Sequence, residues 1–526
     1  MTGKLFYGDN LEILRESIAD ESVDLVYLDP PFNSNASYNV LFKAPDGHES
    51  HAQMEAFDDT WHWTDSAERA FDEVMQSGNT NAAEMLRAMR SFLKENDMMA
   101  YLTMMAVRLI ELHRVLNKTG SLYLHCDPTA SHYLKILLDA IFGPTNFRNE
   151  IIWKRSNPKS HISINFPTCT DTILRYTKSS KATYHQPYED HDPDYVESAY
   201  KYKDENGAYR LLPLLNPNDN RPNLTYEFLG VTRVWRWTKE RMQKAYDDGI
   251  VVQLKPGAVP QYKKYLQDSK GRTVTNCWTD IPQAAGNEAL GYPTQKPLTL
   301  LERIINASSN EGDVVLDPFC GCGTTVHAAQ KLDRQWIGID VTHLAISLIQ
   351  KRLRDAFGPI PIEVHGVPKD LGGAQALADA DKYQFQWWAV SLVDALPFGD
   401  KKKGADGGID GLIYFKPDGK ATEKAIVSVK GGKSVGVTMV KDLIATVDRE
   451  KAKIGIFITL APPTGPMIKE AATAGLYKTE YGTYPKIQIL TVEQLFEGKR
   501  PEMPWIDPTV FRKAKKEDTS KQHKLL

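Results

Sequence analysis

The sequence predicts an α/β protein with a doubly wound, mainly parallel sheet and a second, smaller α/β domain toward its C-terminal end. Apolar runs that end in an acidic residue recur along the chain, and three of them lead to Asp9, Asp29 and Asp340. Segments with apolar residues three and four apart, typical of helices, separate these runs. Strands that alternate with helices indicate parallel pairing, and the carboxyl ends of such strands form the ligand-binding edge of the sheet.

Composition narrows the class of protein. Of the 526 residues, 42% are hydrophobic and 25% are charged, which is typical of a globular chain of two to four domains. The net charge of −3 means that any nucleic-acid binding must depend on local basic patches. The five cysteines show no metal-ligand spacing, so no zinc site is expected, and their odd number favours a reducing cytoplasm. Without a signal-peptide pattern or an apolar run of 18 residues, no membrane association is predicted.

The first motif, Asp29-Pro30-Pro31-Phe32, follows the apolar run 23–28, which is typical of a buried strand. The two prolines fix φ and remove two N–H donors, so the loop keeps free carbonyl acceptors. A carboxylate, free carbonyls and an aromatic ring together suit an exocyclic amine on a planar ring, as in adenine or cytosine. A Pro-rich turn after a strand explains the tetrapeptide alone equally well. A second motif far downstream favours the binding interpretation.

The segments around this motif continue the alternating pattern. Residues 5–10 form a short strand that ends at Asp9, which is either a ligand contact at the sheet edge or the N-cap of a helix. Residues 33–96 are polar and rich in aromatic side chains, and we expect an insertion that folds over a substrate. A helix is predicted at 98–115, followed by a strand at 120–127 and another helix at 131–141.

Residues 154–283 have a different character. Arg and Trp alternate there, as in Arg233-Val234-Trp235-Arg236-Trp237. Arginines suit phosphates and aromatic faces suit bases, so this composition is typical of a nucleic-acid-binding surface. The alternative is a small β-rich subdomain with the tryptophans in its core, which is the interpretation we favour for Trp235 and Trp237 individually.

The second motif is a glycine loop between two strands. A helix predicted at 298–308 leads to a buried strand at 312–319, and Cys320-Gly321-Cys322-Gly323-Thr324-Thr325 then opens a helix. Gly321 and Gly323 let the backbone turn tightly and approach a ligand. The next strand ends at Asp340, 23 positions after Asp317. An acid at this spacing reaches a ribose hydroxyl in nucleotide-binding βαβ units.

These motifs, in this order, resemble the β-class of amino-group DNA methyltransferases, in which the catalytic half precedes the cofactor half. The resemblance covers about residues 1–360 and rests on Gly8-Asp9-Asn10, Asp29-Pro30-Pro31-Phe32, Thr294-Gln295-Lys296-Pro297, the Asp317 strand with its glycine loop, and Asp340. It implies a Rossmann-like sheet formed by residues 1–154 and 285–360. A target-recognition domain is implied at 155–284, between the two halves.

The same resemblance implies S-adenosylmethionine as the methyl donor and double-stranded DNA as the substrate. Asp29 and the Pro30 carbonyl would accept the hydrogens of the target amine, and Phe32 would stack on the extruded base. These residues and Pro31 are the predicted catalytic residues. The predicted cofactor residues are Asp9, Thr294, Asp317, Phe319, Cys320, Gly321, Gly323, Thr324 and Asp340. Asp at position 29 resembles the N6-adenine enzymes, whereas N4-cytosine enzymes more often carry Ser, so adenine is favoured and N4-cytosine is the alternative.

Residues 361–500 form the second predicted domain, and a charged tail, 501–526, follows it. A helix from Asp381, the turn Gly408-Ile409-Asp410, a strand at 425–430, a helix at 440–449 and a strand at 454–459 resemble the Mrr-like branch of the PD-(D/E)xK restriction endonucleases. We expect the tail to be disordered from Lys513 to Leu526 because it is dominated by charged and polar residues.

In that endonuclease family an Asp and a second acidic or amide residue bind Mg²⁺, and a Lys assists the attacking water. Asp410 and Lys430 match these positions, with Asp410 as the metal ligand. Ser428 stands where the second acid is expected, and Gln386 occupies the helix position where the family usually has Glu. Glu423 cannot replace Ser428 because its odd offset points it to the opposite face of the strand. Mg²⁺ is therefore implied only if this domain is active, and the alternative is a DNA-docking domain without cleavage. The chain as a whole suggests a restriction–modification setting, and a homodimer is left open.

Overall fold

The computed structural model describes residues 3–31, 62–157, 166–286, 288–289, 292, 294–398, 408–417, 422–504 and 517, together with the backbone of 37–43 and 49–58. Contacts divide the chain into two compact units, 1–185 with 276–526, and 186–275. The second unit is narrower than the predicted target-recognition domain at 155–284, because a strand at 170–177 belongs to the large sheet of the first unit. Each unit is described separately below.

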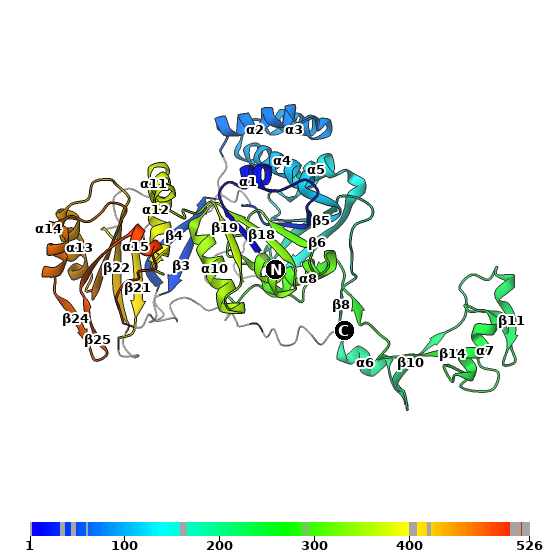
Figure 1. Ribbon diagram of the computed structural model, residues 1–526. Coiled ribbons are helices and arrows are strands. Elements are labelled where there is room, and N and C mark those ends of the chain that lie inside the picture. Colours follow the sequence, from blue (N-terminus) through cyan, green and yellow to red (C-terminus); the bar gives the residue numbers. More distant parts are fainter. Residues whose placement is uncertain are drawn as a thin grey trace. The chain divides into compact units, whose positions relative to one another are not determined.

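A nine-stranded sheet organises the first unit (Figure 1). Its order is β16 (Cys277–Trp278), β6 (Phe147–Lys154), β7 (Thr170–Thr177), β5 (Leu116–Cys126), β2 (Val23–Leu28), β17 (Val314–Asp317), β18 (Gln335–Asp340), β1 (Gly3–Tyr7) and β19 (Ile362–His365). Strands from β5 to β19 run parallel, whereas β7 is antiparallel to both neighbours. The predicted doubly wound sheet is confirmed, and its central strands are apolar because helices cover both faces.

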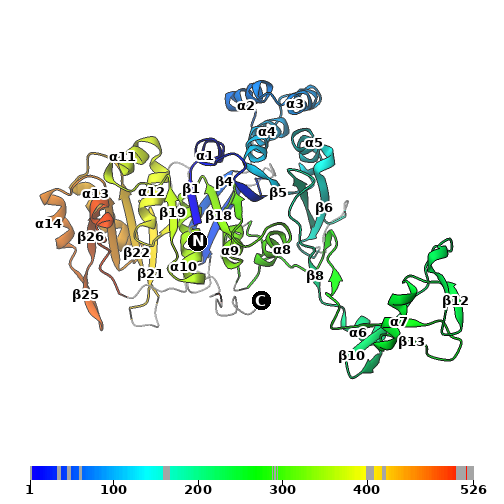
Figure 2. The same cartoon turned by 45° about the vertical axis from the view of Figure 1, so that its right-hand side comes forward.

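The helices lie in two layers around this sheet (Figures 1 and 2). One face carries α1 (Asn10–Ser17), α4 (Asp97–Val115) and α5 (Ser131–Phe142), and the other carries α8 (Leu298–Ser308), α9 (Thr324–Lys331) and α10 (His343–Phe357). A single turn of 3-10 helix, η1 (Pro144–Asn146), follows α5. Leu102, Leu109 and Leu134 are fully buried in the core of the first face. The predicted helices at 98–115, 131–141 and 298–308 are confirmed to within one residue at either end.

The prediction of an insertion at 33–96 was wrong for its second part. Residues 62–96 contain two helices, α2 (Asp65–Gln76) and α3 (Thr80–Leu93), which pack on α4 and place Phe71, Val74 and Leu86 in the core. The antiparallel strands β3 (Ser37–Lys43) and β4 (Glu49–Asp58) precede these helices. The aromatic and charged residues of the segment conceal a buried stripe of Ala, Val and Leu.

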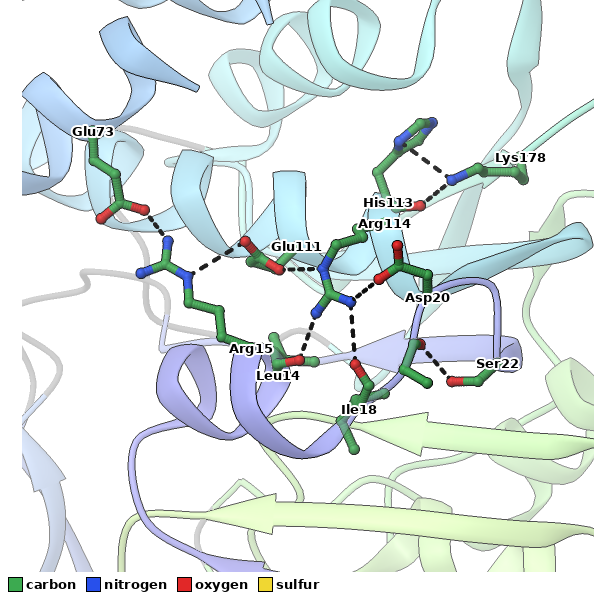
Figure 3. A network of polar contacts seen from close by, with 11 residues as sticks. Leu14, Arg15, Ile18, Asp20, Ser22, Glu73, Glu111, His113, Arg114 and Lys178 are labelled. Atoms are coloured by element: carbon green, nitrogen blue, oxygen red, sulfur yellow. Dashed lines mark hydrogen bonds and ion pairs between the residues drawn. The ribbon is translucent and has the colours of Figure 1, made fainter. Parts of the chain in front are cut away.

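An arginine cluster fixes α1 against α4 (Figure 3). Arg114 of α4 donates hydrogen bonds to the carbonyl oxygens of Leu14 (2.6 Å) and Ile18 (3.1 Å), at the C-terminal end of α1. Glu111 accepts from Arg114 Nε at 2.6 Å and from Arg15 of α1 at 3.4 Å. Carbonyls at the end of a helix have no partner within it, so these bonds close the end of α1 and hold the strand–helix turn before it in place.

The second unit is a small β-rich domain. Its elements are β8 (Tyr188–Glu189), α6 (Pro193–Ala199), β9 (Tyr202–Asp204), β10 (Gly207–Pro213), η2 (Pro222–Leu224), β11 (Thr225–Phe228), β12 (Val231–Val234), α7 (Lys239–Asp247), β13 (Val251–Val252), β14 (Gln261–Tyr265) and β15 (Arg272–Thr273). Trp235 is fully buried in its core and donates to the Tyr226 carbonyl at 2.8 Å. Trp237 is partly buried beneath Arg241, whose guanidinium lies 4.4 Å from the ring centre. The core interpretation is therefore confirmed for Trp235.

The C-terminal domain has a separate five-stranded sheet, β20 (Leu396–Pro397), β21 (Gly411–Phe415), β22 (Glu423–Lys430), β23 (Ile454–Thr459) and β26 (Ile487–Thr491). Its helices are α11 (Leu371–Ala380), α12 (Lys382–Ser391), α13 (Val437–Arg449), α14 (Gly465–Thr473) and α15 (Val492–Phe496), and β24 (Leu476–Thr479) and β25 (Gly482–Pro485) form a hairpin. Apolar clusters fill both faces of the sheet, with α11 and α12 on one and α13 and α14 on the other (Figure 2).

Part of the tail contacts helix α9 of the first unit. Glu517, expected within a disordered segment, accepts a hydrogen bond from His327 at 3.2 Å and pairs with Lys331 at 3.2 Å. The rest of 505–526 lies outside the described residues. Among the helices that the structure describes, none is both long and apolar enough to cross a membrane.

Candidate functional site

A cavity of about 290 Å³ opens at the carboxyl ends of β1, β2, β17 and β18. Both sequence motifs reach it because β2 and β17 are neighbours in the sheet, with Leu25 opposite Val315 and Val26 opposite Leu316. The cavity is close to the lower limit of the ~300–1,000 Å³ typical of small-molecule sites. Its wall includes Asp9, Asn10, Tyr27, Asp29, Pro30, Pro31, Arg108, Tyr292, Thr294, Lys296, Asp317, Phe319, Cys320, Gly321, Thr324, Val341 and Asp340.

Asp29 has two differently engaged carboxylate oxygens. Oδ2 is paired with the ammonium group of Lys296, which comes from the segment before α8. Oδ1 is buried and has no hydrogen-bond partner among the described residues. A buried oxygen without a partner costs roughly 1–3 kcal/mol unless a ligand supplies a donor. The ion pair with Lys296 fixes the carboxylate in place and leaves Oδ1 to accept a hydrogen bond from a ligand.

The glycine loop closes the opposite wall of the cavity. Gly321 has a φ of 49°, and a Cβ there would lie 3.4 Å from the ring of Tyr292. Gly323 has a φ of 74° and caps the N-terminus of α9. The buried guanidinium of Arg352 holds the loop from below by donating to the Cys322 carbonyl and to Thr324 Oγ1, each at 3.1 Å. The loop therefore presents backbone to the cavity in a fixed shape.

Two buried carboxylates flank this loop. Burial raises the pKa of Asp317 to about 7, against hydrogen bonds from Thr325 and the Phe319 N–H that lower it. Burial likewise raises the pKa of Asp340 to about 6. Asp340 accepts from the Gly321 N–H at 2.9 Å and from the Thr342 hydroxyl at 2.8 Å. Both acids face a cavity wall that carries more carboxylates than cations, so a positively charged ligand suits it.

Asp9 is the helix N-cap that the sequence offered, and its side chain also lies in the cavity wall. Its side chain accepts from the Leu11 N–H at 2.8 Å, which makes it the N-cap of α1, and it also lines the cavity. The buried Arg108 of α4 pairs with Asp9 at 2.9 Å and donates to Asn10 Oδ1 at 2.7 Å. Asn10 in turn donates to the Pro318 carbonyl at 2.8 Å. One hydrogen-bonded chain thus links the first strand end to the second motif.

The structure brings nearly all predicted residues of the first site to this cavity. Gly323 is the exception, since it does not line the wall and instead shapes the start of α9. Phe32 lies outside the described residues. Sequence reasoning missed Lys296, Arg108 and Tyr27 as parts of the wall. Tyr27 in β2 and Arg108 in α4 were missed because they stand within apolar patterns. Only Lys296 had a signal, its position beside Thr294 in the motif Thr294-Gln295-Lys296-Pro297.

A second candidate site lies in the C-terminal domain, where Asp410 and Lys430 come together as predicted. Lys430 Nζ lies 3.9 Å from Asp410 Oδ2. The same oxygen accepts from the Val429 N–H at 2.6 Å and from the Ser428 hydroxyl at 3.3 Å. Among the described residues no group of three or more His, Cys, Asp or Glu side chains converges on a point where a metal ion could bind. Asp410 is the one carboxylate that these contacts bring to Lys430.

Comparison with known proteins identifies two matching families. A DNA methylase family of the N6/N4 type matches residues 23–351, and a restriction endonuclease catalytic family of the Mrr type matches residues 377–495. The chain is 29% identical over 369 residues to the type II methyltransferase M.EcaI of Enterobacter cloacae, covering 69% of this chain and 71% of that protein. It is 28% identical over 348 residues to the StyLTI Mod subunit of a type III restriction–modification enzyme of Salmonella typhimurium, covering 62% of this chain and 50% of that subunit.

The methylase match spans the strands that carry Asp29, Asp317 and Asp340, and therefore the cavity between them. The restriction endonuclease match spans Asp410 and Lys430. The chain therefore belongs to the N6/N4 DNA methylase family and carries a restriction endonuclease domain behind its methylase domain.

Proposed function

We propose that this chain transfers a methyl group from S-adenosylmethionine to the N6 amine of adenine in double-stranded DNA, as the modification activity of a restriction–modification system. The observation that carries the proposal is the pair of Asp29 oxygens, one held by Lys296 and the other buried without a partner in the cavity wall. Relatives named as type II and type III methyltransferases support this setting. N4 methylation of cytosine is the alternative, since the family covers both amines.

The described residues fit S-adenosylmethionine. Asp340 stands at the end of β18 with acceptor oxygens for ribose hydroxyls, and Gly321 leaves room that a Cβ would fill. Thr294, Phe319 and Cys320 would enclose the methionine portion, while Asp9 would lie near the adenine ring. The carboxylates of the wall suit a sulfonium cation. When bound, this cofactor supplies a methyl group that the sulfonium activates toward nucleophiles.

The chain's own residues then prepare the amine. The lone pair of an exocyclic amine is delocalised into the ring, so the amine is a poor nucleophile. Asp29 Oδ1 accepts one amine hydrogen and the Pro30 carbonyl accepts the other, which favours a pyramidal nitrogen with an available lone pair. Because both groups follow a rigid, buried strand, they hold the amine in line with the methyl group, and this positioning supplies much of the rate enhancement. Extrusion of the base from the duplex costs a few kcal/mol, and Phe32 would stack on the extruded base.

Replacement of the key carboxylate tests the proposal. Asp29→Ala is expected to abolish methyl transfer, whereas S-adenosylmethionine still binds with an affinity close to that of the wild type. Transfer of radiolabelled methyl groups to unmethylated DNA measures the first quantity and calorimetry the second. Normal methyl transfer by this variant would contradict the assignment. Nucleoside analysis of the modified DNA then separates N6-methyladenine from N4-methylcytosine.

For the C-terminal domain we propose that it docks on DNA. Its family suggests DNA cleavage as the alternative activity. The approach of Lys430 to Asp410 favours a nuclease site. However, the described residues do not fit a resident Mg²⁺, because Asp410 is the single carboxylate there and its Oδ2 already accepts from Val429 and Ser428. We therefore propose no cleavage step for this domain. Lys433 is exposed just beyond Lys430 and is available for contact with DNA phosphates.

A further inference from the structure

A chain of buried polar side chains leads away from the cavity on the side of β5 and β7. Tyr27 lines the cavity, and its hydroxyl lies 2.9 Å from His125 Nδ1. His125 Nε2 lies 3.1 Å from Asp171 Oδ2, and Asp171 Oδ1 is paired with Arg155 at 2.9 Å. His125 is fully buried, Tyr27 is 2% exposed and Asp171 is 6% exposed. None of these side chains is among those assigned above to S-adenosylmethionine, so the buried chain is a candidate for another role.

The reaction proposed above leaves a proton to be removed. As the nitrogen–carbon bond forms, the methyl–sulfur bond breaks and its electron pair goes to sulfur. The methylated amine then holds one proton in excess. Asp29 Oδ1 is the acceptor of this amine in the proposed function, and Tyr27 lines the same cavity two positions before it. Burial and, after it, the nearby Asp29 carboxylate raise the pKa of the Tyr27 hydroxyl, so the two side chains interact.

We propose that Tyr27, His125 and Asp171 form a relay that takes this proton from Asp29, an inference that rests on the proposed methyl transfer. As the Tyr27 oxygen accepts the proton, its own proton passes to His125 Nδ1, and Asp29 returns to its charged form. The resulting imidazolium lies between Tyr27 and the charged Asp171, an arrangement that stabilises a protonated histidine in acid–base catalysis. The proton returns to solvent by the same atoms once the products leave.

The surroundings of His125 support this assignment. Burial alone would raise the pKa of the Asp171 carboxyl, yet His125, Arg155 and Lys296 together hold it below its usual range, so Asp171 is charged. The ring of Trp153 from β6 packs edge-on at 5.7 Å and excludes water from that side. The remaining charges near the relay are Asp29, Asp127 and Asp317. Arg155, whose side chain is 40% exposed, connects the far end of the relay to the surface.

The test compares two isosteric variants. Tyr27→Phe removes the hydroxyl from the relay. Tyr123 lies opposite Tyr27 on the neighbouring strand, and Tyr123→Phe removes a buried hydroxyl that bonds Ser308 at 2.8 Å. Single-turnover transfer of radiolabelled methyl groups from S-adenosylmethionine to random-sequence duplex DNA is measured for the wild type and for each variant. Calorimetry of S-adenosylmethionine binding checks each variant for a folded cofactor site.

Tyr27→Phe is expected to slow transfer by about 10² or more, with unchanged cofactor affinity. The double variant Tyr27→Phe/His125→Gln should be no slower than the slower single variant, because both lie on one route. If Tyr27→Phe transfers methyl groups as fast as Tyr123→Phe while the wild type is active, the relay is wrong and the proposed methyl transfer stands. If the wild type transfers no methyl group, the proposed function is wrong, and the relay is overturned with it.

Discussion

At the scale of single residues, the pairing of Lys296 with Asp29 decides how the acceptor carboxylate is presented. We expect Lys296→Met to slow methyl transfer by about 10–100-fold, because Asp29 loses the cation that fixes Oδ2 in place. Cofactor affinity should change little. Lys135→Met is the matched control, since it removes a lysine that pairs with Asp139 within α5, away from the cavity. Equal rates for the two variants in the radiolabel assay would contradict this role of Lys296.

The raised pKa of Asp340 predicts a pH dependence of cofactor binding. With a pKa of about 6, the side chain is charged at pH 7.5 and largely protonated at pH 5. A protonated acid accepts ribose hydroxyls poorly and no longer attracts a sulfonium. We therefore expect about tenfold weaker binding of S-adenosylmethionine at pH 5 than at pH 7.5 from this group alone.

The raised pKa of Asp340 affects folding stability in the opposite direction to cofactor binding. An acid whose pKa is raised in the folded state favours folding below its unfolded value of about 3.9, and this contribution is lost as the pH rises through 6. Asp340→Asn should bind S-adenosylmethionine weakly and lose the step near pH 6. Binding calorimetry from pH 5 to 7.5 measures the affinity for S-adenosylmethionine and its pH dependence in both proteins. A wild-type affinity that stays constant from pH 7.5 to 5 would rule out a role of Asp340 in cofactor binding.

At the scale of elements, one glycine of the turn before β17 and one of the glycine loop allow backbone strain to be compared with crowding. Both Gly312 and Gly323 adopt left-handed conformations, with φ of 83° and 74°. A Cβ at Gly312 meets nothing within 4 Å, whereas one at Gly323 would lie 2.6 Å from Ile349 Cγ1. Gly312→Ala is expected to cost about 1–2 kcal/mol from backbone strain alone. Gly323→Ala should cost a further ~1–3 kcal/mol from overpacking. Urea unfolding monitors both, and equal costs would contradict the crowding at Ile349.

The sequence predicts elements well where one pattern dominates. The strand before Asp29, the glycine loop and the helix at 298–308 all have strong periodic or turn signals, and the structure confirms them. Helices α2 and α3 were missed because their apolar residues are sparse and their core contacts come from α4. The wall residues Lys296 and Arg108 could not be found from the sequence, since their partners Asp29 and Asp9 lie far away along the chain and meet them only through the sheet order.

At the scale of the whole molecule, that sheet order explains why the two halves of the site are far apart in sequence. The parallel pairing of β2 with β17 places the strand end that leads to Asp29 beside the strand that ends at Asp317. The chain between them contributes β5, β6 and β7 to the same sheet and also forms the separate unit at 186–275. The two halves of the cavity wall can therefore be joined through a long intervening segment without disturbing the cavity.

The C-terminal domain raises the question of whether one polypeptide both marks and cuts DNA. We expect the wild-type chain to methylate DNA and to leave it uncut in the presence of Mg²⁺, because Asp410 is the one carboxylate beside Lys430 among the described residues and a hard divalent cation needs more oxygen charge. The measurement incubates wild type and Asp410→Ala with Mg²⁺ on unmethylated DNA and on DNA already methylated by this protein. Methylation should be equal for the two proteins. If the wild type cuts unmethylated DNA alone and Asp410→Ala does not, the domain is an active nuclease, and Ser428 then takes part in a site that binds its metal together with the DNA phosphate.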